Sequence, residues 1–132
     1  MKKPPLIAIV DDDADDREIV RDAFLAVNSE QSYLFFENGE ELVQYLLNTD
    51  NDKPALVLLD FNMPGMDGRE TLKNLKAHAA LSAIPTLVLT TSSSPRDRSL
   101  AYTLGANCFI SKPDTFQKLT EMAICISKLW LQ

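Results

Sequence analysis

The sequence contains few of the residues that typify exported, zinc-binding or membrane proteins. Its 132 residues include only 2 cysteines, 1 histidine and 4 glycines. Cys108 and Cys125 lie 17 positions apart, a spacing that matches no common zinc or redox motif, so we expect two small apolar side chains in a reducing compartment. No apolar run approaches the roughly 18 residues of a membrane span. The run after the basic start, Leu6 to Val10, is too short for an export signal. We therefore expect a cytoplasmic protein with no membrane segment.

Positive charge is also scarce, because 13 basic residues face 19 acidic ones and leave a net charge of −6. Nucleic-acid binding usually requires a clustered basic surface, so this balance argues against direct binding of DNA or RNA. The acidic excess is local, with five aspartates inside positions 11–16. A chain of this length corresponds to one domain, at about 100–150 residues per domain. We expect a single domain over residues 1–132, with a flexible leader at 1–5 and no separate output module.

Short apolar runs alternate with amphipathic stretches along the chain. The expected strands lie at 6–10, 32–36, 55–59, 85–90 and 107–111. Apolar residues at helical spacing mark the stretches 19–27, 42–47, 72–79, 94–104 and 116–130. The strands at 6–10 and 55–59 are continuously apolar, which is typical of strands covered on both faces. This alternation predicts a doubly wound α/β fold, with a parallel sheet between two layers of helices.

Some polar residues have a purely local interpretation. Asp13, Asp15 and Asp16 stand where the first helix should begin, and aspartates at that position cap the helix and complement its dipole. Ser94 is placed to cap the helix at 94–104, and Gly105 to end it. These residues are expected to define helix boundaries.

Other polar side chains follow the strands at the edge where such folds bind their ligands. Asp11 to Asp13 follow the first strand and Asp60 the third, while Thr90 ends the fourth and Lys112 follows the fifth. Converging carboxylates repel one another and need a cation, and an incomplete set of oxygen ligands favours Mg²⁺. A hydroxyl and an ammonium opposite the metal suit a transferring phosphoryl group, for which an aspartate is a possible nucleophile. Spacing alone does not decide which two of the first three aspartates belong to this site.

Taken together, these residues resemble the receiver domain of two-component response regulators, which has the fold of the chemotaxis regulator. The resemblance covers about residues 6 to 130, and its motifs are Val10-Asp11-Asp12, Leu58-Leu59-Asp60, Met63-Pro64-Gly65-Met66-Asp67-Gly68, Leu89-Thr90 and Lys112-Pro113. It implies a flavodoxin-like sheet of five strands in the order 2-1-3-4-5 with five helices. It also implies a protein that signals through protein–protein contacts and is no enzyme beyond self-catalysed phosphotransfer and slow autodephosphorylation.

The resemblance assigns a role to each site residue. Asp60 is expected to accept a phosphoryl group from a histidine kinase or a histidine phosphotransfer protein. Asp12, Asp60 and the backbone carbonyl of Asn62 are expected to bind Mg²⁺ directly, and Asp11 through a water.

The same resemblance implies that Thr90 and Lys112 contact the phosphoryl oxygens. Phosphorylation is expected to draw Thr90 inward and to open space into which the aromatic switch residue Phe109 turns. The Lys112–Pro113 peptide bond is expected to be cis, an isomer that is accessible at proline.

The stretch Thr91-Ser92-Ser93 and the ending Trp130-Leu131 further resemble the small single-domain regulators that partner phytochrome-type histidine kinases. In those relatives two receivers can pair through the surface that here corresponds to the helix at 94–104, the strand at 107–111 and the helix at 116–130. Trp130 is expected to serve mainly in ordinary packing of the last helix. Because the receiver uses the whole chain, output is expected to pass through an unidentified partner protein.

Three other functions remain open at this point. Haloacid-dehalogenase-type phosphatases also use an aspartate, a hydroxyl, a lysine and Mg²⁺, but they place a second aspartate two residues after the nucleophile, where this chain has Asn62. A flavodoxin-like nucleotide binder needs a phosphate loop after the first strand, and the aspartates there would repel a phosphate. A receiver that signals without phosphorylation would not need the complete set of site residues.

Overall fold

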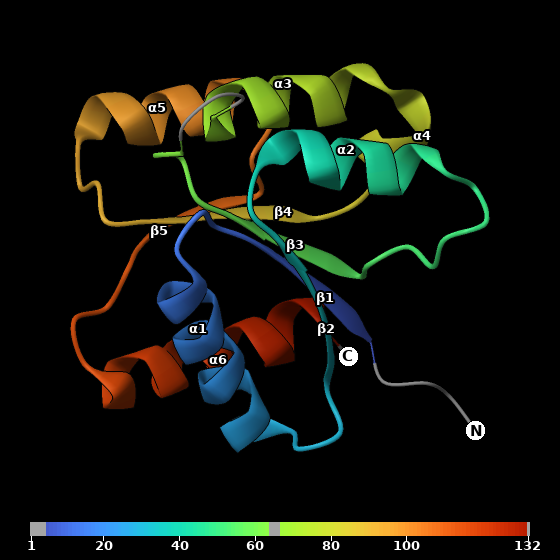
Figure 1. Ribbon diagram of the computed structural model, residues 1–132. Coiled ribbons are helices and arrows are strands. Elements are labelled where there is room, and N and C mark those ends of the chain that lie inside the picture. The colour runs from blue at the N-terminus through green and yellow to red at the C-terminus, as the bar shows by residue number, and fades with distance from the viewer. Residues whose placement is uncertain (1–4, 64–66, 132) are drawn as a thin grey trace.

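The computed structural model describes residues 5–63 and 67–131, and it shows a parallel sheet between two layers of helices (Figure 1). The strands are β1 Leu6–Val10, β2 Ser32–Phe36, β3 Leu56–Leu59, β4 Thr86–Thr90 and β5 Cys108–Ser111. The helices are α1 Ala14–Val27, α2 Gly39–Leu47, α3 Gly68–Ala77, α4 Ala79–Ser82, α5 Pro95–Thr103 and α6 Phe116–Trp130. The sheet order is β2-β1-β3-β4-β5. This confirms the predicted doubly wound α/β fold and its strand order.

Two apolar cores lie on opposite faces of the sheet, because successive side chains of a strand point to opposite sides. Ala8 and Val10 of β1 pack in the core beneath α2, α3 and α5, whereas Ile7 and Ile9 pack beneath α1 and α6. All of β3 and β4 is buried. The continuously apolar sequence of the central strands is therefore explained by burial on both faces.

The helix boundaries follow the local signals in the sequence. The Asp13 side chain accepts hydrogen bonds from the backbone N–H groups of Asp15 and Asp16, and Ser94 accepts one from Asp97. Gly105 follows α5 with φ = 105°, a left-handed conformation that favours glycine. The caps proposed for Asp13 and Ser94 and the stop at Gly105 are confirmed.

The number of helices was predicted wrongly, since the described residues contain six and not five. The apolar pattern at 72–79 was interpreted as one helix, but α3 ends at Ala77 and the backbone of His78 is extended. The short α4 then brings Leu81, which is 2% exposed, into the core. The chain thus breaks the helix to bury one more leucine before β4.

Two expectations fall partly or wholly on undescribed residues. Of the proposed leader at 1–5, residues 1–4 lie outside the described part, and the carbonyl of Pro5 accepts a hydrogen bond from the Gln31 side chain. Of the motif Met63-Pro64-Gly65-Met66-Asp67-Gly68, residues Pro64, Gly65 and Met66 also lie outside it. Within the part of the chain that the structure does describe, none of the helices is both long and apolar enough to span a membrane.

Candidate functional site: an acidic cluster at the carboxyl edge of the sheet

Three carboxylates meet where β1 and β3 end. The strands are paired in register, with Val10 opposite Leu59, and the N–H of Asp60 donates to the Val10 carbonyl at 3.0 Å. One carboxylate oxygen from each of Asp11, Asp12 and Asp60 lies within 4.8 Å of the others. Hard oxygen donors at this spacing fit a divalent cation of the Mg²⁺, Mn²⁺ or Ca²⁺ type. Register therefore selects Asp11 and Asp12 from the acidic run, the pair that the resemblance implied.

Asp11 and Asp60 are the buried members of this cluster. They are 4% and 9% exposed, whereas Asp12 is exposed to solvent. Asp11 Oδ1 accepts a hydrogen bond from the N–H of Asp13 at 3.0 Å, and Asp60 Oδ1 accepts one from the N–H of Asn62 at 3.1 Å. These bonds fix one oxygen of each carboxylate and leave the second oxygen of each available for other contacts.

Lys112 supplies the positive charge of the site. Its Nζ lies 2.7 Å from Asp11 Oδ2 and 4.0 Å from Asp60 Oδ2. Burial lowers the pKa of Lys112, but the hydrogen bond to Asp11 and the charges of Asp11, Asp60 and Asp16 outweigh it, so the net shift is upward. The surrounding carboxylates therefore favour the charged form of Lys112 beside Asp60.

Asp60 is held in a setting that disfavours its ionised form. Burial raises the pKa of Asp60 above its usual range, and the charge of Asp11 adds to this rise. The N–H of Asn62, the charge of Lys112 and the Thr90 hydroxyl act in the opposite direction without cancelling it. The fold consequently favours anything that neutralises this carboxylate, whether a cation beside it or a group bonded to it.

Thr90 lies fully buried at the end of β4, next to this pair. Its Oγ1 accepts hydrogen bonds from the Asn62 side chain at 3.3 Å and from the N–H of Ser92 at 3.4 Å. Its carbonyl accepts from the N–H of Lys112 at 2.7 Å, which joins the ends of β4 and β5. The structure thus brings together the predicted residues Asp11, Asp12, Asp60, Thr90 and Lys112.

One sequence-based expectation near β5 is wrong. The described residues contain no cis peptide bond, so the Lys112–Pro113 bond is trans, the isomer that X–Pro bonds favour by about 0.5–1 kcal/mol. Phe109, the expected aromatic switch residue, is buried, at 4% exposed, and its movement on phosphorylation stays a prediction. Its ring meets the Phe61 ring edge-on with centroids 6.1 Å apart. Edge-on packing of two rings is a favourable arrangement for aromatic side chains.

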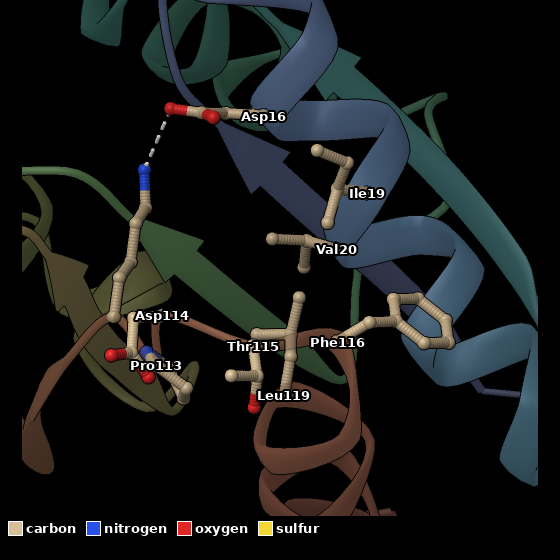
Figure 2. A pocket seen from close by; sticks show the side chains of 9 residues that line it. Asp16, Ile19, Val20, Pro113, Asp114, Thr115, Phe116 and Leu119 are labelled. Carbon is tan, nitrogen blue, oxygen red and sulfur yellow. Dashed lines mark hydrogen bonds and ion pairs between the residues drawn. The ribbon is translucent and has the colours of Figure 1, made fainter.

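Sequence reasoning missed two residues of the first helix that belong to the site. Asp16 was assigned to the helix end, yet its Oδ2 lies 3.2 Å from Lys112 Nζ (Figure 2). Arg17 Nη1 donates to the backbone carbonyl of Asp11 at 2.6 Å. Both lie in the first turns of α1, directly above the end of β1, and that position was the signal that could have identified them.

A cavity of about 380 Å³ opens beside the Asp16–Lys112 pair (Figure 2). Ile19 and Val20 of α1 line it on one side, and Phe116 and Leu119 of α6 on the other. Ile19 and Phe116 are 46% and 51% exposed. The site is thus flanked by an accessible apolar hollow with an ion pair at one end.

Known proteins share both the sequence pattern and the fold. The family model of the response regulator receiver domain matches residues 7–124. Response regulator Rcp1 from Synechocystis sp. is 30% identical over 133 residues, covering 98% of this chain and 90% of that protein. The crystal structure of the Mn²⁺-bound form of Rcp1 superposes with a TM-score of 0.86 at 30% identity, over 98% of this chain and 96% of that one.

A second solved structure extends this similarity. The phosphorylated cyanobacterial phytochrome response regulator RcpA has a TM-score of 0.88 at 30% identity, over 98% of this chain and 95% of that chain. The similarity to small regulators of the phytochrome type is therefore confirmed. From its sequence, its fold and its acidic site, the chain belongs to the response regulator receiver domain family.

Proposed function

We propose that this protein is a phosphorylation switch of a two-component phosphorelay, in which Asp60 accepts the phosphoryl group. The observation that carries the proposal is the position of the Asp60 carboxylate, 4.0 Å from the Lys112 ammonium and within the cluster formed by Asp11 and Asp12. The similarity to RcpA, whose phosphorylated form has been solved, supports it. A structural ion pair alone would not need a third carboxylate or a buried hydroxyl at the same edge.

The proposed donor is the phosphohistidine of a histidine kinase or of a histidine phosphotransfer protein. An Asp60 oxygen attacks phosphorus, the P–N bond breaks, and the imidazole leaves with the electron pair of that bond. The product is an acyl phosphate, which water later hydrolyses to the carboxylate and inorganic phosphate. Lys112 and Thr90 would stabilise the phosphoryl oxygens by charge and hydrogen bonding. Beyond this transfer and slow autodephosphorylation we propose no enzymatic turnover.

We infer that Mg²⁺ is the metal of the site. Asp12 and Asp60 would hold it directly with the Asn62 carbonyl, and Asp11 would act through a water. When bound, the ion would neutralise the carboxylates and the incoming phosphoryl oxygens. The Mn²⁺-bound form of the relative Rcp1 supports a divalent ion.

The phosphodonor would dock over the cavity beside Lys112. Ile19 and Phe116 offer exposed apolar contacts there. Lys112 lines the cavity, and its ammonium group also lies near Asp60. Replacing Ile19 by glutamate should slow transfer from a phosphorylated protein donor and leave transfer from acetyl phosphate unchanged. Ile124→Glu is the matched control, because Ile124 is also exposed, at 39%, but does not line this cavity.

Several further features are proposed on the same basis. The chain would act as a single receiver domain in the cytoplasm, where the proposed donors hold their phosphohistidines, with a phytochrome-type kinase as one candidate donor. It would signal through a partner protein and not through nucleic acid or membrane.

A homodimer through α5, β5 and α6 is also proposed, since β5 is an edge strand and Leu129 of α6 is 76% exposed. Size measurement with and without beryllofluoride tests this pairing.

The decisive test of the proposed function is labelling with a small phosphodonor. Acetyl phosphate and Mg²⁺ should add one phosphoryl group, detected as a mass increase, and chelation of the metal should abolish it. Asp60→Asn should remove the labelling, whereas Asp22→Asn, at an exposed position of α1 outside the acidic cluster, should retain it. Equal labelling of wild type and the Asp60→Asn variant would overturn the assignment.

A further inference from the structure

A chain of polar contacts joins α3 to the loop between β4 and α5. Arg69 Nη2 lies 3.0 Å from Asp97 Oδ1, which connects the first turns of the two helices. The Ser92 hydroxyl donates to the second oxygen of Asp97 at 2.7 Å. The Arg69 and Asp97 side chains are 32% and 18% exposed, so solvent screens their interaction only in part.

The same arginine also contacts the aromatic pair behind Asp60. Its guanidinium lies 4.9 Å from the centroid of the Phe61 ring, at the distance of a cation–π contact. The Phe61 ring in turn packs edge-on against Phe109. Arg69 therefore contacts the residue that follows the phosphoacceptor on one side and, on the other, Asp97 of α5, which binds Ser92 of the loop after Thr90.

Thr90 is coupled to this loop by its own hydrogen bonds. Thr90 Oγ1 accepts from the N–H of Ser92 at 3.4 Å, and the Ser92 carbonyl accepts from the Ser111 hydroxyl at 3.2 Å. A phosphoryl group on Asp60 adds oxygens that the Thr90 hydroxyl has to meet. A shift of Thr90 toward these oxygens pulls on the Ser92 N–H, and Ser92 cannot follow Thr90 freely while Asp97 holds its hydroxyl.

We propose that the Arg69–Asp97 ion pair is a latch that holds the β4–α5 loop in its unphosphorylated arrangement. Arg69 and Asp97 are then positioning residues, since they act on Asp60 chemistry through Ser92 and Thr90 and do not touch the phosphoryl group. The latch opposes phosphorylation and speeds the return to the resting state. This inference rests on the proposed function of Asp60.

Charge on both partners supports this role at neutral pH. Hydrogen bonds from Ser92 and Arg69 lower the pKa of Asp97 below its usual range. Arginine side chains in general carry a positive charge at physiological pH. A neutral amide at position 97 would keep the shape of the side chain and lose the charge.

The test measures beryllofluoride affinity in saturating Mg²⁺ by isothermal titration calorimetry. The variants are Asp97→Asn, Arg69→Met and their combination, and either single variant suffices if the other fails to fold. The control is Asp22→Asn, which breaks another Arg–Asp pair at the same 3.0 Å, within α1. Opening the latch should tighten binding about fivefold, the effect of one partly buried ion pair. The double variant should bind no tighter than the single ones, and Mg²⁺ affinity should not change.

Each outcome is informative. Unchanged or weaker beryllofluoride binding in both single variants would overturn the latch and leave the proposed function standing. Equal tightening by Asp22→Asn would also overturn it, because the effect would then be unspecific. A wild-type protein that takes up no beryllofluoride would instead contradict the proposed function itself.

Discussion

Replacing Gly68 by alanine is the most informative change that leaves every site side chain intact. A Cβ at this position would lie 2.3 Å from the carbonyl oxygen of Asp60 and 2.5 Å from the Cα of Phe61. Both are backbone atoms, so no side chain can rotate away. The N–H of Gly68 also donates to the Phe61 carbonyl at 3.2 Å. Either the start of α3 or the backbone at Asp60 and Phe61 therefore has to move.

The magnitude follows from the size of this clash. Contacts of this kind cost about 1–3 kcal/mol of folding stability. A displacement of ~1 Å at a reacting group lowers a rate by about 100-fold. We therefore expect Gly68→Ala to unfold at lower urea concentration and to take up phosphoryl from acetyl phosphate on the order of 100 times more slowly.

Gly39→Ala is the matched control for this prediction. Its Cβ would meet the Thr71 side chain, at 1.6 Å from Oγ1. Thr71 would have to rotate and give up its hydrogen bond to the Asp67 carbonyl, so stability should fall by a similar amount, about 1–3 kcal/mol. The phosphorylation rate should stay near that of wild type. A normal rate in Gly68→Ala, or equal loss of rate in both variants, would refute the proposed link between the start of α3 and the position of Asp60.

Further predictions at three residues concern charge and buried polar groups. Tyr33→Phe should stabilise the protein by about 1 kcal/mol in urea unfolding, because the Tyr33 hydroxyl is buried with no hydrogen-bond partner among the described residues. A Tyr33 pKa of about 12, raised mainly by burial, should appear as late ionisation in an absorbance titration. Lys112→Met should destabilise metal-free protein by about 3 kcal/mol, since it leaves Asp11 buried without its cation, and the loss should be smaller in Mg²⁺. Because the pKa of Asp97 is lowered by Ser92 and Arg69, its contribution to stability is present above the unfolded pKa of 3.8 and is lost as pH falls through the lowered value. Asp97→Asn should therefore flatten the acid side of the stability profile, and an unchanged profile would contradict this.

The sheet could be predicted because its strands are buried on both faces. Residues 6–10 and 55–59 have no polar side chain to distinguish a solvent face, and the structure places β1 and β3 in the centre of the sheet. The boundary after α3 could not be predicted in the same way. The apolar spacing continues through Ala79, and only tertiary packing of Leu81 decides that the helix breaks at His78.

The site was predictable where strand ends position it and unpredictable where side chains reach across from another element. Asp60, Thr90 and Lys112 were identified because each follows or ends a strand. Asp16 contacts Lys112, which lies almost a hundred positions later in the sequence. A helix-capping explanation was sufficient for Asp16 in the sequence, so its position in the first turn of α1 was not interpreted as a sign of a second role.

Arg69 shows the same limit more clearly. Its position in the first turn of α3 indicates only a surface arginine. Its contacts with Asp97 and with the Phe61 ring depend on how α3 and α5 lie side by side on one face of the sheet (Figure 1). Such a contact is a property of the packed layer and has no local sequence signal.

The measurement that tests the account most directly is the chemical identity of the phosphorylated residue. The protein should be phosphorylated in Mg²⁺ by a phosphohistidine donor, treated with hydroxylamine, and mapped by peptide mass spectrometry. The account predicts a hydroxylamine-sensitive acyl phosphate whose modified peptide contains Asp60. A hydroxylamine-resistant phosphate, or a modified peptide without Asp60, would contradict it.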